Sequence, residues 1–119
     1  MNRFSATFEL PYPPSVNHYY RHVGSRVLIS RVGRLYRERV AALIFSSGVP
    51  KYPGDVFLEI QAYPPDCRRR DIDNLLKSLF DALTEAGLYK DDYNIKKLNI
   101  EMLEPMPPDG LLVMRVHPR

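Results

Sequence analysis

Asp71 and Asp73 are the residues whose type and spacing best suit chemistry, and they directly follow three arginines, Arg68, Arg69 and Arg70. In extended backbone, side chains two positions apart point to the same side, so both carboxylates can face one point. Two carboxylates that close repel each other unless one is protonated or a cation lies between them. The pair therefore predicts a cation site. Mg²⁺ suits it, because this ion prefers oxygen and is often held by one or two carboxylates plus a substrate phosphate.

Two structural explanations of the acidic pair remain open. Asp73 stands where a helix begins, so its carboxylate could serve as the helix N-cap. A cap needs only one acid, which leaves the second unexplained. Alternatively, the three arginines beside the pair could neutralise both carboxylates without any metal ion.

A third carboxylate is expected from the turn that contains Asp91 and Asp92, which follows the helix that begins near Asp73. If that helix crosses back over the sheet edge, the turn approaches the first two acids. Lys77 lies one helical turn after Asp73, so it either contacts a substrate phosphate or forms an ion pair with Asp73 or Asp81. Asp81 itself is expected to be structural.

Other short motifs are excluded or weakened by their surroundings. A calcium loop of the EF-hand type needs further oxygen ligands and a glycine, where this chain has Leu75 and Leu76. Sugar-nucleotide transferases with an Asp-x-Asp motif are normally much longer than this chain. A zinc cluster is not indicated, because Cys67 is the only cysteine and the histidines are scattered at His18, His22 and His117.

The bulk composition indicates an ordinary globular protein. The 119 residues suit one domain, residues 1–119, and the 45% hydrophobic and 26% charged residues exclude a disordered chain. The sequence lacks an apolar run of roughly 18 residues, so no membrane span is expected, and its start lacks a signal peptide's apolar region. The single cysteine favours a reducing compartment, the cytoplasm.

The distribution of charge says more than its sum. The formal net charge is +3, which alone does not establish nucleic-acid binding. Between residues 15 and 39, however, six arginines accompany a single acid, Glu38. Clustered arginine is expected of a phosphate-binding face, although a solvated charged surface remains the alternative.

The hydrophobic periodicity predicts an α+β fold, an α/β sandwich with one mixed sheet of four or five strands and two helices packed on it. Strands are expected at residues 4–10, 26–29, 55–63, 95–103 and 111–116. The first helix should span residues 30–46, with Ser30 as its cap and a buried stripe of Val32, Leu35, Tyr36, Val40, Leu43 and Ile44. The second should span residues 73–86 and end at Gly87, with an apolar face of Leu75, Leu76, Leu79, Phe80 and Leu83.

Two longer motifs make the chain similar to the RusA-type Holliday junction resolvases. The first covers residues 13–22, Pro-Pro-Ser-Val-Asn-His-Tyr-Tyr-Arg-His. The second covers residues 68–77, Arg-Arg-Arg-Asp-Ile-Asp-Asn-Leu-Leu-Lys, and continues through residues 80–87 to Asp91 and Asp92. The resemblance spans nearly the whole chain and is weakest at residues 23–28 and 48–54.

This resemblance implies a Mg²⁺-dependent endodeoxyribonuclease of bacteria and phages that resolves four-way DNA junctions. It places the catalytic, metal-binding carboxylates on Asp71, Asp73 and Asp92, with one or two Mg²⁺ per subunit. The functional lysine falls on Lys77, and Asp91 remains a secondary candidate.

The DNA-binding residues implied by the same resemblance are Arg68, Arg69, Arg70 and Lys77, with Asn17 as a further candidate in the proline-rich motif. The family is homodimeric, which suits a junction with approximate two-fold symmetry, because a C2 dimer presents two sites to two strands of like polarity. The neighbouring Tyr19 and Tyr20 either support the site or contact DNA.

Two other functions remain open from the residues alone. One is a basic nucleic-acid-binding module without catalysis, in which the acids are caps and ion-pair partners. The other is a metal-dependent nuclease for other branched DNA. Cleavage of a synthetic junction with and without Mg²⁺ separates them.

Overall fold

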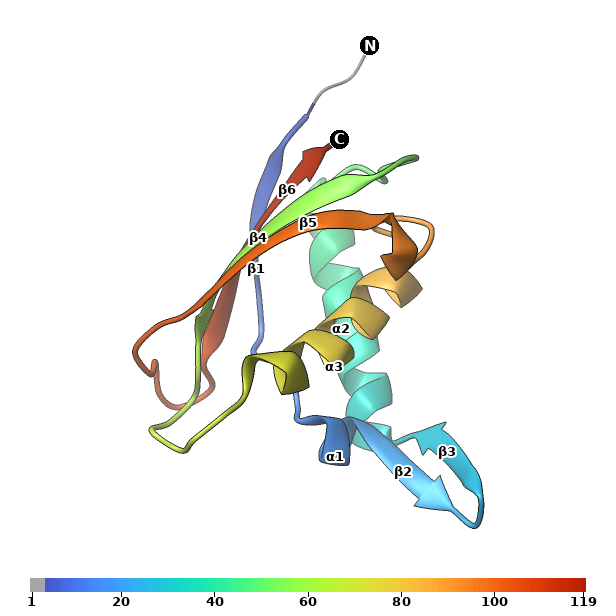
Figure 1. The fold of residues 1–119 in the computed structure, drawn as a ribbon, viewed down its shortest axis with the longest axis vertical. Coiled ribbons are helices and arrows are strands. Elements are labelled where there is room, and N and C mark those ends of the chain that lie inside the picture. Colours follow the sequence, from blue (N-terminus) through green and yellow to red (C-terminus); the bar gives the residue numbers. More distant parts are fainter. Residues whose placement is uncertain (1–3) are drawn as a thin grey trace.

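The computed structural model describes residues 4–119 and shows a layered α+β fold (Figure 1). Along the chain the elements are β1 (Ala6–Leu10), α1 (Val16–Tyr19), β2 (Tyr20–Val23), β3 (Arg26–Ile29), α2 (Arg31–Ser46), β4 (Val56–Tyr63), α3 (Ile72–Ala86), the 3₁₀ helix η1 (Asp92–Asn94), β5 (Ile95–Met102) and β6 (Leu111–Pro118). None of the helices within these residues is long and apolar enough to cross a membrane.

The main sheet is mixed, with four strands in the order β1-β6-β4-β5. Its strand β4 runs parallel to β5 and antiparallel to β6. The predicted alternation in β4 is confirmed, since the inward side chains Val56, Leu58, Ile60 and Ala62 are at most 2% exposed. They form one core with residues of α2 and α3, which lie on the same side of the sheet (Figure 1).

Helix α3 is the crossover between the parallel strands β4 and β5. Parallel neighbours need such a connection, because the chain must return to the end of the sheet at which the first strand began. The loop before α3 therefore follows the end of β4, and the turn after it precedes the start of β5. The two loops lie at opposite ends of these strands (Figure 1).

The predicted first helix is confirmed as α2, but its buried face is narrower than expected. Ser30 accepts a hydrogen bond from the backbone N–H of Gly33 at 3.0 Å, as an N-cap should. Val32 and Leu35 are about half exposed, at 51% and 52%, so their assignment to the buried stripe is wrong. The buried face of this helix is centred instead on Gly33, Tyr36, Val40 and Ile44.

The predicted second helix is confirmed as α3, starting one residue earlier than expected. Its core-facing residues include Leu75, Leu79 and Leu83, all at most 3% exposed. Gly87 ends it in the left-handed conformation, with φ +79°. This is the conformation that a C-terminal glycine adopts without steric cost.

The short elements α1 and β2 are not predicted from the sequence. Strand β2 pairs with β3 in a separate two-stranded sheet, so residues 26–29 do not belong to the main sheet. This hairpin extends from the end of the molecule at which α1 lies (Figure 1). Elements of four residues are too short to show a hydrophobic period, which explains the omission.

Gly33 should tolerate no side chain, because a Cβ there would lie 2.4 Å from the carbonyl oxygen of Tyr19 and 2.8 Å from Cγ1 of Ile29. We expect Gly33→Ala to lower the free energy of unfolding by about 1–3 kcal/mol, the usual cost of overpacking. Gly54→Ala is the matched control, since nothing lies within 4 Å of its added Cβ. Urea denaturation measures both, and equal midpoints would contradict the close approach of α1 to α2.

Candidate metal and nucleic-acid site

Asp71 and Asp73 lie at the start of α3 with both carboxylates exposed. Asp71 occupies the N-cap position, but its side chain makes no capping hydrogen bond. Asp73 stands in the first turn, so the interpretation of Asp73 as the N-cap is wrong. Neither carboxylate has a hydrogen bond or ion pair with any residue from 4 to 119. Both oxygens of each acid are therefore available to a ligand.

Two of the three arginines before the pair bind a different acid, Asp66. Arg70 Nη1 lies 2.6 Å from Asp66 Oδ1, and Arg68 Nη2 lies 3.1 Å from Asp66 Oδ2. Hydrogen bonds from Arg70 and then Arg68 hold the pKa of Asp66 well below its usual range. Arg68 and Arg70 therefore do not neutralise Asp71 and Asp73, and Arg69 forms no ion pair with either acid among the described residues. The contacts to Asp66 hold the loop and leave the acidic pair without an ion pair in residues 4–119.

Asn74 connects the start of α3 to the proline-rich segment. Its Oδ1 accepts a hydrogen bond of 2.9 Å from the backbone N–H of Val16, the first residue of α1. This contact places α1, with the exposed candidate Asn17, beside the first turn of α3. No role for Asn74 is predicted from the sequence, since a contact across 58 positions leaves no local signal.

Lys77 is exposed on α3 one turn after Asp73. Its Nζ lies 6.0 Å from the centroid of the Tyr20 ring. Among the described residues it has no ion pair with Asp73 or with Asp81, so neither expected structural partner occupies it. The ammonium group is free to meet an anion near the acidic pair.

Asp81 has the structural role that was expected for it. The hydroxyl of Tyr19, on a fully buried ring, donates to Asp81 Oδ2, and Arg37 Nε donates to the same oxygen at 2.7 Å. Burial and the Asp81 hydrogen bond raise the pKa of Tyr19. Burial lowers the pKa of Arg37, but the bonds to Asp81 and Tyr19 raise it more. Tyr19 is therefore a support of the site and has no surface to offer DNA.

Asp91 and Asp92 share the turn before β5, where they have different local roles. Asp91 caps η1, because its Oδ1 accepts a hydrogen bond of 3.3 Å from the backbone N–H of Tyr93. In return, the backbone N–H of Asp91 donates to Oδ1 of Asn94 at 3.1 Å. The hydrogen bond between the two carboxyl groups lowers the pKa of Asp91 and raises that of Asp92. The proximity of the two like charges makes this turn a second place where a cation is favourable.

The structure does not gather the three predicted acids within one chain. Asp92 lies near Asp81, whose charge contributes to its raised pKa, and Asp81 is about 12 Å along the helix from Asp73. No group of three acidic, histidine or cysteine side chains among residues 4–119 is arranged to hold a metal ion. The suggestion that the turn approaches the first two acids in the same chain is wrong, because the loop before α3 and the turn after it lie at opposite ends of the helix.

Comparison with known proteins identifies the family. The family model described as endodeoxyribonuclease RusA matches residues 11–110, which include both acidic sites and the arginine loop. The chain belongs to the RusA endodeoxyribonuclease family. It is 39% identical over 117 residues to the crossover junction endodeoxyribonuclease RusA of Escherichia coli strain K12, covering 98% of this chain and 95% of that protein.

Other RusA proteins match to a similar degree. The crossover junction endodeoxyribonuclease of Enterobacteria phage 82 is 40% identical over 117 residues, with 98% of this chain and 95% of that protein covered. The enzyme of Escherichia coli O139:H28 is 45% identical over 93 residues, covering 77% of this chain and 76% of that protein. The resemblance drawn from the motifs is therefore confirmed.

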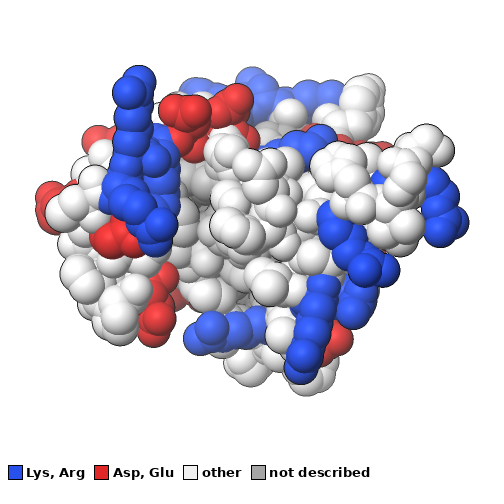
Figure 2. Space-filling model, turned by 90° about the horizontal axis from the view of Figure 1, so that it is seen from below, with Lys and Arg blue, Asp and Glu red and all other residues white. Residues whose placement is uncertain are grey.

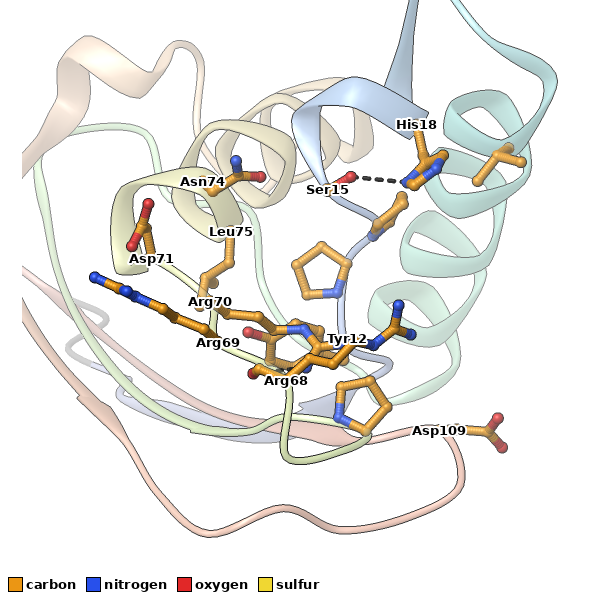
Figure 3. A pocket seen from close by; sticks show the side chains of 14 residues that line it. Tyr12, Ser15, His18, Arg68, Arg69, Arg70, Asp71, Asn74, Leu75 and Asp109 are labelled. Carbon is orange, nitrogen blue, oxygen red and sulfur yellow. Dashed lines mark hydrogen bonds between the residues drawn. The ribbon is translucent and has the colours of Figure 1, made fainter.

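A pocket of about 620 Å³ opens beside Asp71 in this RusA-family chain (Figure 3). It lies between the proline-rich segment that contains Tyr12, the arginine loop, and the start of α3 at Asn74 and Leu75. Neither Tyr12 nor Asp109, which also lines it, was singled out from the sequence. Only the fold brings these distant segments together.

The end of the molecule seen from below carries basic side chains on both flanks of a largely uncharged middle, with most acidic side chains toward the left (Figure 2). Arg21, Arg26, Arg31 and Arg34 are all exposed on the hairpin and α2, and Arg68 and Arg69 are exposed on the loop before α3. Basic groups spaced in this way suit the phosphates of a nucleic acid.

The bond between Asp81 and its two partners should contribute measurably to stability. Asp81→Ala leaves the hydroxyl of Tyr19 and the guanidinium of Arg37 without their acceptor, so we expect a loss of about 1–3 kcal/mol in the free energy of unfolding. Glu85→Ala is the control, because this half-exposed acid only approaches Arg37 at 3.9 Å. Its change should stay within about 0.5 kcal/mol. Equal losses in the two variants by urea denaturation would show that the network is not stabilising.

Proposed function

We propose that this RusA-family endodeoxyribonuclease resolves four-way (Holliday) DNA junctions by paired, Mg²⁺-dependent nicks. The single observation that carries the proposal is the start of α3, where two exposed, unpaired carboxylates stand beside a free lysine and an arginine loop. The names of the relatives, crossover junction endodeoxyribonucleases, supply the substrate class. Cytoplasmic DNA of a bacterial or phage-infected cell is the proposed setting.

The metal ligands in this proposal are Asp71, Asp73 and Asp92, holding one or two Mg²⁺. Their carboxylate oxygens are the donors that this hard ion prefers. Bound Mg²⁺ supplies activation of water and stabilisation of charge on the phosphate and the leaving oxygen. Asp91 is the weaker candidate, because its carboxylate already caps η1.

The cations around the acids bind the DNA backbone in this proposal. Lys77 stabilises negative charge on the scissile phosphate, and Arg69, which has no ion pair among the described residues, holds a neighbouring one. Arg68 and Arg70 share a single acid, Asp66, so together these three residues keep a net positive charge. Binding of this kind weakens steeply with salt, because bound phosphates release their counterions.

A homodimer completes the metal site in this proposal, because one chain keeps its acids at opposite ends of α3. When two chains pair about a two-fold axis, the Asp71 and Asp73 of one protomer can meet the Asp92 of its partner. Large exposed side chains flank both acidic groups: Ile72 is 38% and Tyr93 is 74% exposed. In this proposal both side chains are buried between the two protomers.

Asp73→Asn should bind a synthetic four-way junction but not cut it. The change keeps the side chain's size and removes the negative charge of a proposed metal ligand. Loss of a residue that only supports a ligand typically costs about 10–100-fold, so we expect nicking to fall by more than about 100-fold. Glu38→Gln, an exposed acid on α2, is the control and should nick normally. Gel shift and nicking assays with and without EDTA measure the two steps. Undiminished nicking by Asp73→Asn, or equally rapid cutting of linear duplex, would contradict the proposal.

Mixed dimers test whether the site is shared between chains. In a dimer of one Asp73→Asn chain and one Asp92→Asn chain, a shared arrangement leaves one site with all three acids. The mixture should therefore nick one strand of the junction, although each variant alone is inactive. If each site drew its acids from one chain, both sites in the mixed dimer would lack an acid. No activity after mixing and subunit exchange would then reject the shared site.

A further inference from the structure

The pocket beside Asp71 has the size and shape of a small-ligand site. Its volume of about 620 Å³ falls within the range of roughly 300–1,000 Å³ usual for such sites. Tyr12 and Leu75 contribute apolar wall, and Val32, half exposed in the first turn of α2, lines it from the other side. Side chains of this kind suit the flat face of a nucleobase better than a bare anion.

Polar groups inside the pocket have hydrogen-bonding capacity left over. Asn74 uses its Oδ1 for the Val16 backbone, and its Nδ2 has no partner among residues 4–119. The Oγ of Ser15 lies 2.8 Å from Nδ1 of His18, an interaction drawn in Figure 3, and Nε2 of that ring has no partner in the same residues. These atoms are able to meet the polar edge of a base.

Three arginines and two acids, Asp71 and Asp109, line the pocket, so positive charge prevails around it, as a nucleotide's phosphates require. Arg68 and Arg69 line it and are exposed, and Asp71, a proposed metal ligand, borders it on the α3 side (Figure 3). A phosphate held at the metal site is thus next to the mouth of the pocket. The nucleotide attached to that phosphate is the part of a DNA substrate that can reach inside.

We propose that the pocket receives one unstacked nucleotide of the junction, the neighbour of the phosphate that is cut; this rests on the proposed function. Enzymes that take a nucleotide from the stack must disrupt its stacking and pairing, and a base that is already unpaired resists least. Bases at a branch point are less constrained than those inside a linear duplex. The pocket then contributes to the choice of branched DNA over duplex.

The first test places 2-aminopurine at successive positions around the branch point of a four-way junction. Its fluorescence is low in a base stack and rises when the base leaves it. When the Asp73→Asn variant binds the junction without cutting it, we expect the fluorescence to rise at one position next to the nick site. Adding Val32→Trp, which fills the pocket, should abolish this rise. Adding Leu35→Trp should not, since Leu35 is equally exposed on the same helix but does not line the pocket.

Cleavage by the otherwise wild-type chain provides a second readout. Val32→Trp should slow junction nicking by about ten-fold or more, because misplacing a reacting group is costly. Its junction affinity should stay close to that of the parent, and Leu35→Trp should match the parent in both. Circular dichroism melting of both tryptophan variants checks that they fold alike.

The outcomes separate the pocket from the function on which it depends. A fluorescence rise that survives Val32→Trp, or nicking equal in the two tryptophan variants, overturns the pocket proposal while leaving the nuclease intact. A bound junction that shows no rise at any position also overturns it. If the parent and both variants bind but none nicks, the proposed function fails together with the inference drawn from it.

Discussion

The hydrogen bonds that the Asp81 carboxylate accepts are the interactions on which the arrangement of the site depends. The carboxylate receives the buried hydroxyl of Tyr19 and the guanidinium of Arg37, and so joins α1, α2 and α3 at one point. A polar network whose members are all hydrogen-bonded holds its elements in place, whereas a partly satisfied one is costly. Because Tyr19 is held there, the proline-rich segment before it lies along the start of α3. The Asn74 contact to Val16, and one wall of the pocket, depend on that placement.

The separation of charges around the start of α3 follows from short-range pairing. Asp66 binds Arg68 and Arg70 within its own loop, so these arginines are not drawn onto Asp71 and Asp73. The acidic pair keeps its mutual repulsion, which a metal ion relieves. The same loop still carries more positive than negative charge, which suits a polyanion. Because Asp66 takes up two of the arginines, two unpaired carboxylates and a basic loop lie side by side at the start of α3.

The topology of the main sheet constrains how any active centre is assembled. A helix between two parallel neighbours must run from the C-terminal end of the first strand back to the N-terminal end of the second. The acids before and after α3 are consequently held apart by the fold that positions them. If the metal site uses both groups, as we propose, it needs a second chain, and the proposed homodimer then has a chemical role as well as a match to the symmetry of a junction.

The sequence by itself determined the two long helices, the strands of the main sheet and the identity of the exposed chemical groups, because periodicity and capping signals act over a few neighbouring residues. Gly87 as a helix end and the alternation of β4 are of this kind. Tertiary structure alone decided which contacts span the chain. It separated the hairpin from the main sheet, turned Val32 and Leu35 outward, and used Tyr19 as a buried support. It also gave Asp81 its partners. It held Asp92 away from Asp71 and Asp73, since these acids lie at opposite ends of α3 and the rise of a helix fixes the distance between them.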